Sequence, residues 1–235
     1  MEQQGQFRVT GVVLHRKDLS SSLRTLYLWC REKGPFWVFA PGSGRGKISR
    51  GYTEPLVWGE FHLYKSPRGI YLKVADLRED FWDFRKSPRK MREALQWAGL
   101  LKKNLLAEHP EDALLRVFYW SLILLREGAP LPPLRWRFLW KWLSLWGRAP
   151  DLWRCEHCGK LLEENPAYTQ GARTGFLCPL CGNSSGGLEA TLVLQELRKA
   201  VMLSRSDFRN YSFTLTPLQW EEKTKILEEL VSDRI

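Results

Sequence analysis

Two pairs of cysteines constrain the fold of this chain more than any other feature. Cys155 and Cys158 form the first pair, Cys178 and Cys181 form the second, and each pair has a two-residue spacer and a glycine after it. The spacer lets both sulfurs of a pair reach one ion from a tight turn, and glycine supplies the positive φ that such a turn commonly needs. Two such pairs are typical of a four-cysteine zinc site. We therefore expect one structural Zn²⁺ bound by these four thiolates.

Other uses of these cysteines fit the sequence less well. A thioredoxin-like redox motif has one pair beside a βαβ pattern, and two disulfides require an oxidising compartment. A catalytic zinc needs an open coordination position, which four thiolates do not leave. His157 stands inside the first pair and could displace a cysteine, although an exposed turn residue is the simpler interpretation. The predicted ion therefore supports folding rather than chemistry.

Length and composition predict a folded protein of the cytoplasm. The 235 residues suffice for one large or two to three small domains, and 44% hydrophobic residues with 12 Trp predict a substantial core. The longest apolar run, 113–125, contains Arg116 and is too short to span a bilayer. The first residues lack the basic and apolar regions of a signal peptide. We expect a cytoplasmic protein without membrane contact.

Positive charge is concentrated in the first part of the chain. The formal net charge is +10, and residues 1–90 hold 17 Lys and Arg against 9 Asp and Glu. This asymmetry favours a polyanionic partner, and a solvated basic face is the alternative. The candidates for phosphate contact are Arg8, Arg16, Lys17, Arg24, Arg45, Lys47 and Arg50, extended at the domain junction by Arg85, Lys86, Arg89 and Lys90.

Alternating hydrophobicity predicts about five short strands in the first 75 residues. They are expected over 7–14, 23–30, 35–40, 57–64 and 70–74. Such strands suit a small barrel of the OB-fold type, and an SH3-like barrel fits the same pattern. The Gly-rich basic segment 41–50 is no P-loop, because Pro41 and Ile48 stand where that motif needs Gly and Ser or Thr. It can follow a phosphate backbone, or it is simply a surface loop.

From about residue 77 the hydrophobic period becomes helical. Helices are expected over 87–106, 111–128, 134–146 and 188–203 and from Thr216 onward, with residues 131–133 separating the second from the third. Four Trp on the third helix could stack on bases, but core packing is the better interpretation. The predicted fold class is α+β: an OB-fold-like barrel over 1–78, then an all-α domain over 79–150 and 184–235. The zinc module, 151–183, is embedded in that helical domain.

No catalytic constellation is visible in the sequence. We find no paired-carboxylate metal site, no nucleophile with a base and no nucleotide-binding loop. We therefore expect no enzymatic activity. Two other function classes stay open at this point: a DNA-processing nuclease with a zinc ribbon, and an RNA-binding or transcriptional zinc-ribbon protein.

The order of these parts resembles the RecO family of bacterial recombination mediators over nearly the whole chain. The motifs that carry the resemblance are residues 11–18, Arg24 with Leu26 and Leu28, residues 31–34, residues 40–42 with Arg45 and Lys47, Pro55, and residues 146–152 before Cys155. The chain departs from the family at residues 19–21, where aromatic-Gly-Glu is usual. It also has Pro41 and Gly44 where cations are usual.

This resemblance implies a DNA repair and recombination mediator. Such a protein binds single-stranded and double-stranded DNA, anneals complementary strands and, with RecR, helps load RecA onto DNA coated by single-strand-binding protein (SSB). It acts at the bacterial nucleoid. The family also implies a helical-domain pocket for the acidic, apolar C-terminal tail of SSB, whose candidate cations are Lys102, Lys103, Arg126, Arg135 and Arg137.

Overall fold

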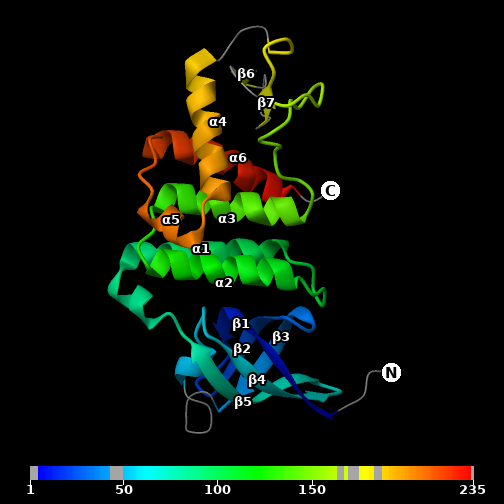
Figure 1. Cartoon of the computed structure of the whole chain (residues 1–235). Coiled ribbons are helices and arrows are strands. Elements are labelled where there is room, and N and C mark those ends of the chain that lie inside the picture. The colour runs from blue at the N-terminus through cyan, green and yellow to red at the C-terminus, as the bar shows by residue number, and fades with distance from the viewer. Residues whose placement is uncertain (1–4, 43–49, 163–166, 169–174, 183–186, 234–235) are drawn as a thin grey trace. The chain divides into compact units, whose positions relative to one another are not determined.

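The computed structural model describes residues 5–42, 50–162, 167–168, 175–182 and 187–233. The chain forms two compact units, residues 1–116 and 117–235. Figure 1 labels the elements of both units. The finer division at residues 78, 150 and 183 stays a prediction.

The chain begins with the strands β1 to β5 and continues mainly with helices, which confirms the α+β class. The strands are β1 (Gly5–Asp18), β2 (Leu23–Cys30), β3 (Gly34–Pro41), β4 (Trp58–Ser66), β5 (Gly69–Glu79), β6 (Ala167–Tyr168) and β7 (Phe176–Leu177). The α-helices are α1 (Pro88–Asn104), α2 (Asp112–Arg126), α3 (Leu131–Leu145), α4 (Gly187–Met202), α5 (Arg205–Asn210) and α6 (Pro217–Ser232). Two short 3₁₀ helices are η1 (Arg50–Thr53) and η2 (Trp82–Lys86).

The first five strands close into a barrel in the order β1-β2-β3-β5-β4 (Figure 1). β1 is long enough to pair with two neighbours: its first half pairs with β4 and its second half with β2. β3 and β5 run parallel, and the other pairs of the barrel are antiparallel. This closed five-stranded arrangement confirms the OB-fold-like barrel.

Side chains on alternate positions of the strands fill the barrel. Its core includes Val9, Leu26, Val38, Leu63 and Leu72, each at most 2% exposed. Gly11 of β1 is the register partner of Cys30 of β2, and a Cβ at Gly11 would lie 2.2 Å from the carbonyl oxygen of Trp29. The absence of a side chain at Gly11 therefore allows the close approach of the two strands at this position.

Helix α1 packs against β1 in the same unit. Its buried face includes Ala94, Trp97, Ala98 and Leu101. The expected start is confirmed, with Ser87 at the N-cap and Pro88 at the first position, but the Ser87 side chain makes no capping hydrogen bond.

Two helix predictions needed correction. α3 begins at Leu131 rather than 134, because prolines need no N–H partner in the first turn and Pro132 and Pro133 fit there. α5 was missed because it has only six residues; the side chain of Ser204 caps it by accepting from the Asp207 N–H. The expected start of the last helix is confirmed by a complete capping box between Thr216 and Gln219.

The second unit is built on α3, which packs against α4 and α6. Trp136 and Trp142 of α3 are at most 1% exposed, and the Trp136 ring centroid lies 5.9 Å from that of Trp220 on α6. These tryptophans therefore serve the core, as the sequence analysis favoured. Within the described ranges, no helix combines the length and apolar character needed to cross a bilayer.

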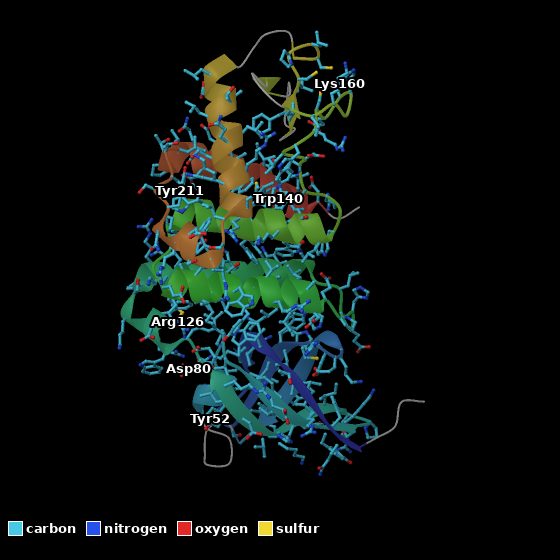
Figure 2. All side chains as sticks on the ribbon, viewed as in Figure 1. Tyr52, Asp80, Arg126, Trp140, Lys160 and Tyr211 are labelled. Atoms are coloured by element: carbon cyan, nitrogen blue, oxygen red, sulfur yellow. The ribbon has the colours of Figure 1, made fainter. Side chains whose placement is uncertain are left out.

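Two buried charged side chains hold the end of α4. The guanidinium of Arg137 donates to the carbonyl oxygens of Ala200 and Leu203 at 3.0 and 3.1 Å, where a helix C-terminus leaves acceptors unpaired. The carboxylate of Glu196, 1% exposed, accepts from the Lys199 ammonium and from the hydroxyl of Tyr211, the residue labelled in Figure 2. Both charges are therefore satisfied inside the unit.

Candidate metal centre and nucleic-acid interface

The four predicted cysteines come together from two turns of the second unit. Their sulfur atoms all lie within 4.8 Å of one another. The Cys158 and Cys178 sulfurs are 3.7 Å apart. Gly159 has φ +73°, the conformation that the sequence pattern predicts after the first pair. Cys155 and Cys178 are buried, so this side of the sulfur group is covered by protein.

The chemistry of this group fits a bound cation. Burial opposes ionisation of Cys155, but backbone hydrogen bonds at Cys158, Cys178 and His157 outweigh it and lower the Cys155 pKa to about 6. The hydrogen bond with Cys178, together with burial, raises the pKa of Cys181 to about 12. A divalent cation at the centre would let all four thiols ionise together. His157 is exposed and does not belong to the sulfur group.

Helix α4 holds the turn that carries the first cysteine pair. Arg198 donates to the carbonyl oxygens of Leu152 and Leu162, each at 2.8 Å. Between these two contacts, Arg154 and Leu161 form an isolated antiparallel bridge. Trp140 of α3, labelled in Figure 2, donates its indole N–H to the Pro150 carbonyl at 3.1 Å. The cysteine turn is therefore bonded to the helices of its own unit.

The cations predicted to contact phosphate differ in their surroundings. Arg8 has a side chain 72% exposed and lies 3.3 Å from Glu60. Arg16 is ion-paired with Glu54, and Lys17 is exposed near the end of β1. In the second group, Arg85, Lys86 and Arg89 are exposed, Lys90 is half-buried, and the Arg85 guanidinium lies 4.5 Å from the Trp82 ring centroid.

Arg24, predicted to contact phosphate, is buried rather than exposed on the surface. It is 8% exposed, its Nε lies 2.6 Å from a carboxylate oxygen of Asp18, and its Nη1 donates to Thr53 at 2.7 Å. Its charge is therefore satisfied by the protein. Arg45 and Lys47 lie outside the described residues, as does the side chain of Arg50.

The five cations considered for the SSB tail belong to different units. Lys102 and Lys103 are part of the first unit, while Arg126, Arg135 and Arg137 are part of the second. Lys102 lies 5.6 Å from the Trp37 ring centroid on the barrel. Arg137 is 7% exposed and bonded to the end of α4. One pocket within a single unit therefore cannot use all five.

The barrel also brings together a group that sequence reasoning missed. Glu60 and His62 of β4 and Asp76 of β5 place three possible metal ligands within 4.8 Å of one another. However, Glu60 also pairs with Arg8 at 3.3 Å and Arg78 at 3.6 Å. These guanidinium groups already balance its charge, so the group forms a surface ion-pair network. The sequence could not predict this group because it does not show that Glu60 and Asp76 are opposite each other on β4 and β5.

Comparison with known proteins identifies the family. Residues 94–235, more than half of the chain, match the family described as recombination protein O C terminal, RecO. The chain belongs to the RecO family. Over 233 residues it is 24% identical to the DNA repair protein RecO of Acetivibrio thermocellus, covering 97% of this chain and 91% of that protein. It is 26% identical over 212 residues to the DNA repair protein RecO of Desulforamulus reducens, covering 86% and 82% respectively.

These RecO relatives agree with the expected class of function. A third, the DNA repair protein RecO of Bacillus pumilus, is 27% identical over 172 residues, with 73% of this chain and 66% of the relative covered. The first two alignments cover more than four-fifths of this chain and of each RecO relative. The chain is therefore a DNA repair protein of the RecO family.

Proposed function

We propose that this chain is a recombination mediator that binds single-stranded and double-stranded DNA and anneals complementary strands. With RecR it helps load RecA onto DNA coated by SSB, whose C-terminal tail binds the helical domain. The single observation that carries the proposal is the RecO family match over residues 94–235. The protein acts in the bacterial cytoplasm, at the nucleoid.

The barrel supplies a physical basis for this activity. Annealing requires a surface that neutralises phosphate repulsion between two strands and leaves their base edges free. Exposed cations at Arg8 and Lys17, and at Arg85, Lys86 and Arg89 in η2 and at the start of α1, can supply such a surface. Arg16, Arg45, Lys47, Arg50 and Lys90 complete the proposed set. We assign Arg24 to the support of Asp18 and Glu54 instead.

We further propose that Cys155, Cys158, Cys178 and Cys181 bind one structural Zn²⁺. The support is the close approach of the four sulfurs and the preference of zinc for tetrahedral thiolate coordination. Four thiolates leave no open position, so the ion would stabilise the fold around the cysteine turns and would not activate water.

The binding proposal is tested with labelled single-stranded DNA, duplex DNA and RNA of one sequence, incubated with the purified protein and Mg²⁺. We expect both DNA forms to bind and to stay intact. Strand cleavage would reject the mediator in favour of a nuclease. A strong preference for RNA would instead indicate recognition of the 2′-hydroxyl and an RNA-binding role.

A further inference from the structure

Four aromatic side chains occupy the outer surface of three adjacent barrel strands. Trp37 and Phe39 are on β3, Tyr71 is on β5 and Tyr64 is on β4. Their neighbours in sequence, including Val38, Leu63 and Leu72, point into the core, so these four rings point outward. We call Trp37, Phe39, Tyr71 and Tyr64 the aromatic strip.

The strip is continuous across the strands. Phe39 and Tyr71 are register partners, and their ring centroids are 5.4 Å apart with an interplanar angle of 27°. Tyr71 is in turn the register partner of Tyr64. Trp37 lies two residues before Phe39 on the same face of β3 and is 46% exposed. The rings therefore follow one another from β3 through β5 to β4.

Cations stand at both ends of the strip. The Lys102 ammonium from α1 lies 5.6 Å from the Trp37 ring centroid, and the Lys73 ammonium lies 5.4 Å from the Tyr64 ring centroid. Further along the same face, Glu60 and Asp76 are register partners, and Glu60 pairs with Arg8 and Arg78, so this part of the face carries a balanced ion-pair network. A polyanion is therefore attracted at the two ends of the strip.

Sheet stability alone does not account for this arrangement. Cross-strand aromatic pairs do stabilise a sheet, and the Phe39–Tyr71 pair does so here. The outer face of an antiparallel sheet is normally polar, however, and Trp37 leaves nearly half of its surface in water. The other three rings are half-buried. Rings that are at least partly exposed and stand next to cations are the arrangement by which proteins bind single-stranded nucleic acid, because bases stack on the rings while cations contact phosphates.

We propose that the aromatic strip is a stacking site for the bases of single-stranded DNA. This inference rests on the proposed function and specifies how one strand is held. Stacking uses the faces of the bases and leaves their pairing edges exposed, so a strand on the strip stays available to a complementary strand. Bases inside a duplex are covered on both faces, so duplex DNA binds through the cations alone.

The test compares four ligands by fluorescence anisotropy at one salt concentration: single-stranded oligothymidine, an abasic strand of equal length, duplex DNA and RecR. Trp37→Leu and Tyr71→Leu remove a ring but keep an apolar side chain. Each should weaken oligothymidine binding about fivefold or more and leave duplex and abasic binding unchanged. Trp120→Ala, which removes an exposed Trp of the other unit, is the matched control and should change nothing.

The outcomes separate this inference from the proposed function. If the wild type binds both DNA forms and the Leu variants bind all ligands equally well, the strip is not a stacking site, while the mediator proposal stands. An equal loss for duplex, abasic and oligothymidine DNA would mean that the rings only support the barrel. Loss of RecR binding with unchanged DNA affinity would make the strip a protein interface. Failure of the wild type to bind any DNA would overturn the proposed function itself.

Discussion

The guanidinium Nε of Arg198 donates a hydrogen bond to the carbonyl oxygen of Leu152 at 2.8 Å. Through Nη2, the same side chain reaches the carbonyl of Leu162 at the same distance, on the far side of the first cysteine pair. Burial lowers the pKa of Arg198, while the charge of Asp151 opposes that shift. One arginine of α4 thus holds both ends of the segment that carries Cys155 and Cys158.

Removing this arginine should loosen the metal centre. Arg198→Ala leaves two carbonyl groups without their charged donor, so we expect a loss of about 2–4 kcal/mol in the free energy of unfolding. Zinc should also transfer faster to a chelator, measured by a colorimetric competition assay. Gln195→Ala, at an exposed position of the same helix, is the control and should have neither effect. Equal chelator rates for both variants would contradict the role assigned to Arg198.

Two glycines of the first unit should respond in opposite ways to alanine. At Gly11 the new Cβ would lie 2.2 Å from the Trp29 carbonyl oxygen, so Gly11→Ala should force β1 and β2 apart and lower the melting temperature. At Gly99, inside α1, the new Cβ would meet no described atom within 4 Å apart from the adjacent residues and the helix's own backbone. Gly99→Ala should therefore stabilise the protein by about 0.5–1 kcal/mol. Thermal melts that rank the two variants the other way would contradict the barrel packing.

Lys141 on α3 should make stability depend on pH. Burial, together with the charge of Arg137, lowers the Lys141 pKa from its ordinary 10.5 to about 8. Between these values the unfolded chain binds more protons than the folded one, so this residue's contribution to stability rises with pH from 8 to 10.5. Lys141→Met should therefore stabilise the protein at pH 7, by about 1 kcal/mol after allowing for solvent screening.

Urea unfolding of the wild type and Lys141→Met at pH 7 and pH 10 measures this effect. Other titrating groups are common to both proteins, so the difference between the proteins isolates Lys141. The advantage of the Met variant should shrink at pH 10. An advantage that is the same at both pH values would show that the cost of Lys141 is not its charge.

Phosphate contacts should make DNA binding strongly dependent on salt. If about six of the proposed cations bind phosphates, log K for single strands should fall against log[salt] with a slope of about −4. Replacing Arg45, Lys47 and Arg50 together by Ala should weaken binding to all sequences about equally and flatten the slope by about 2. A flat salt response of the wild type, or a loss confined to some sequences, would contradict a phosphate-binding surface.

Local patterns predicted much of this structure because short-range physics decides those parts. The cysteine spacing predicted the group of four sulfurs, and the alternation around Phe61 and Leu63 predicted the buried face of β4. On β5 the alternation predicted Leu72 correctly but not Val74, which is 52% exposed, because the β4–β5 register shifts between His62 and Leu63. The start of the last helix could be predicted because the two residues of its capping box, Thr216 and Gln219, lie within one helical turn. In each case the residues that matter are close in sequence.

Features that depend on contacts between residues far apart in the sequence could not be predicted from it. The sequence marks Arg24 only as a cation, and its burial follows from contacts with Asp18 in one direction and Thr53 and Glu54 in the other. The roles of Arg198 and of the aromatic strip likewise depend on which strands and turns become neighbours. The sequence shows aromatic residues at alternate positions of three strands. That they are neighbours follows only from the pairing register of those strands.

The most direct test of the central claim is the annealing rate of complementary DNA strands that are both coated with SSB. We expect the wild-type protein to accelerate duplex formation, and the acceleration to fall as salt rises, because phosphate neutralisation weakens with salt. If the protein binds DNA but leaves the annealing rate of coated strands unchanged, it is not the mediator proposed here.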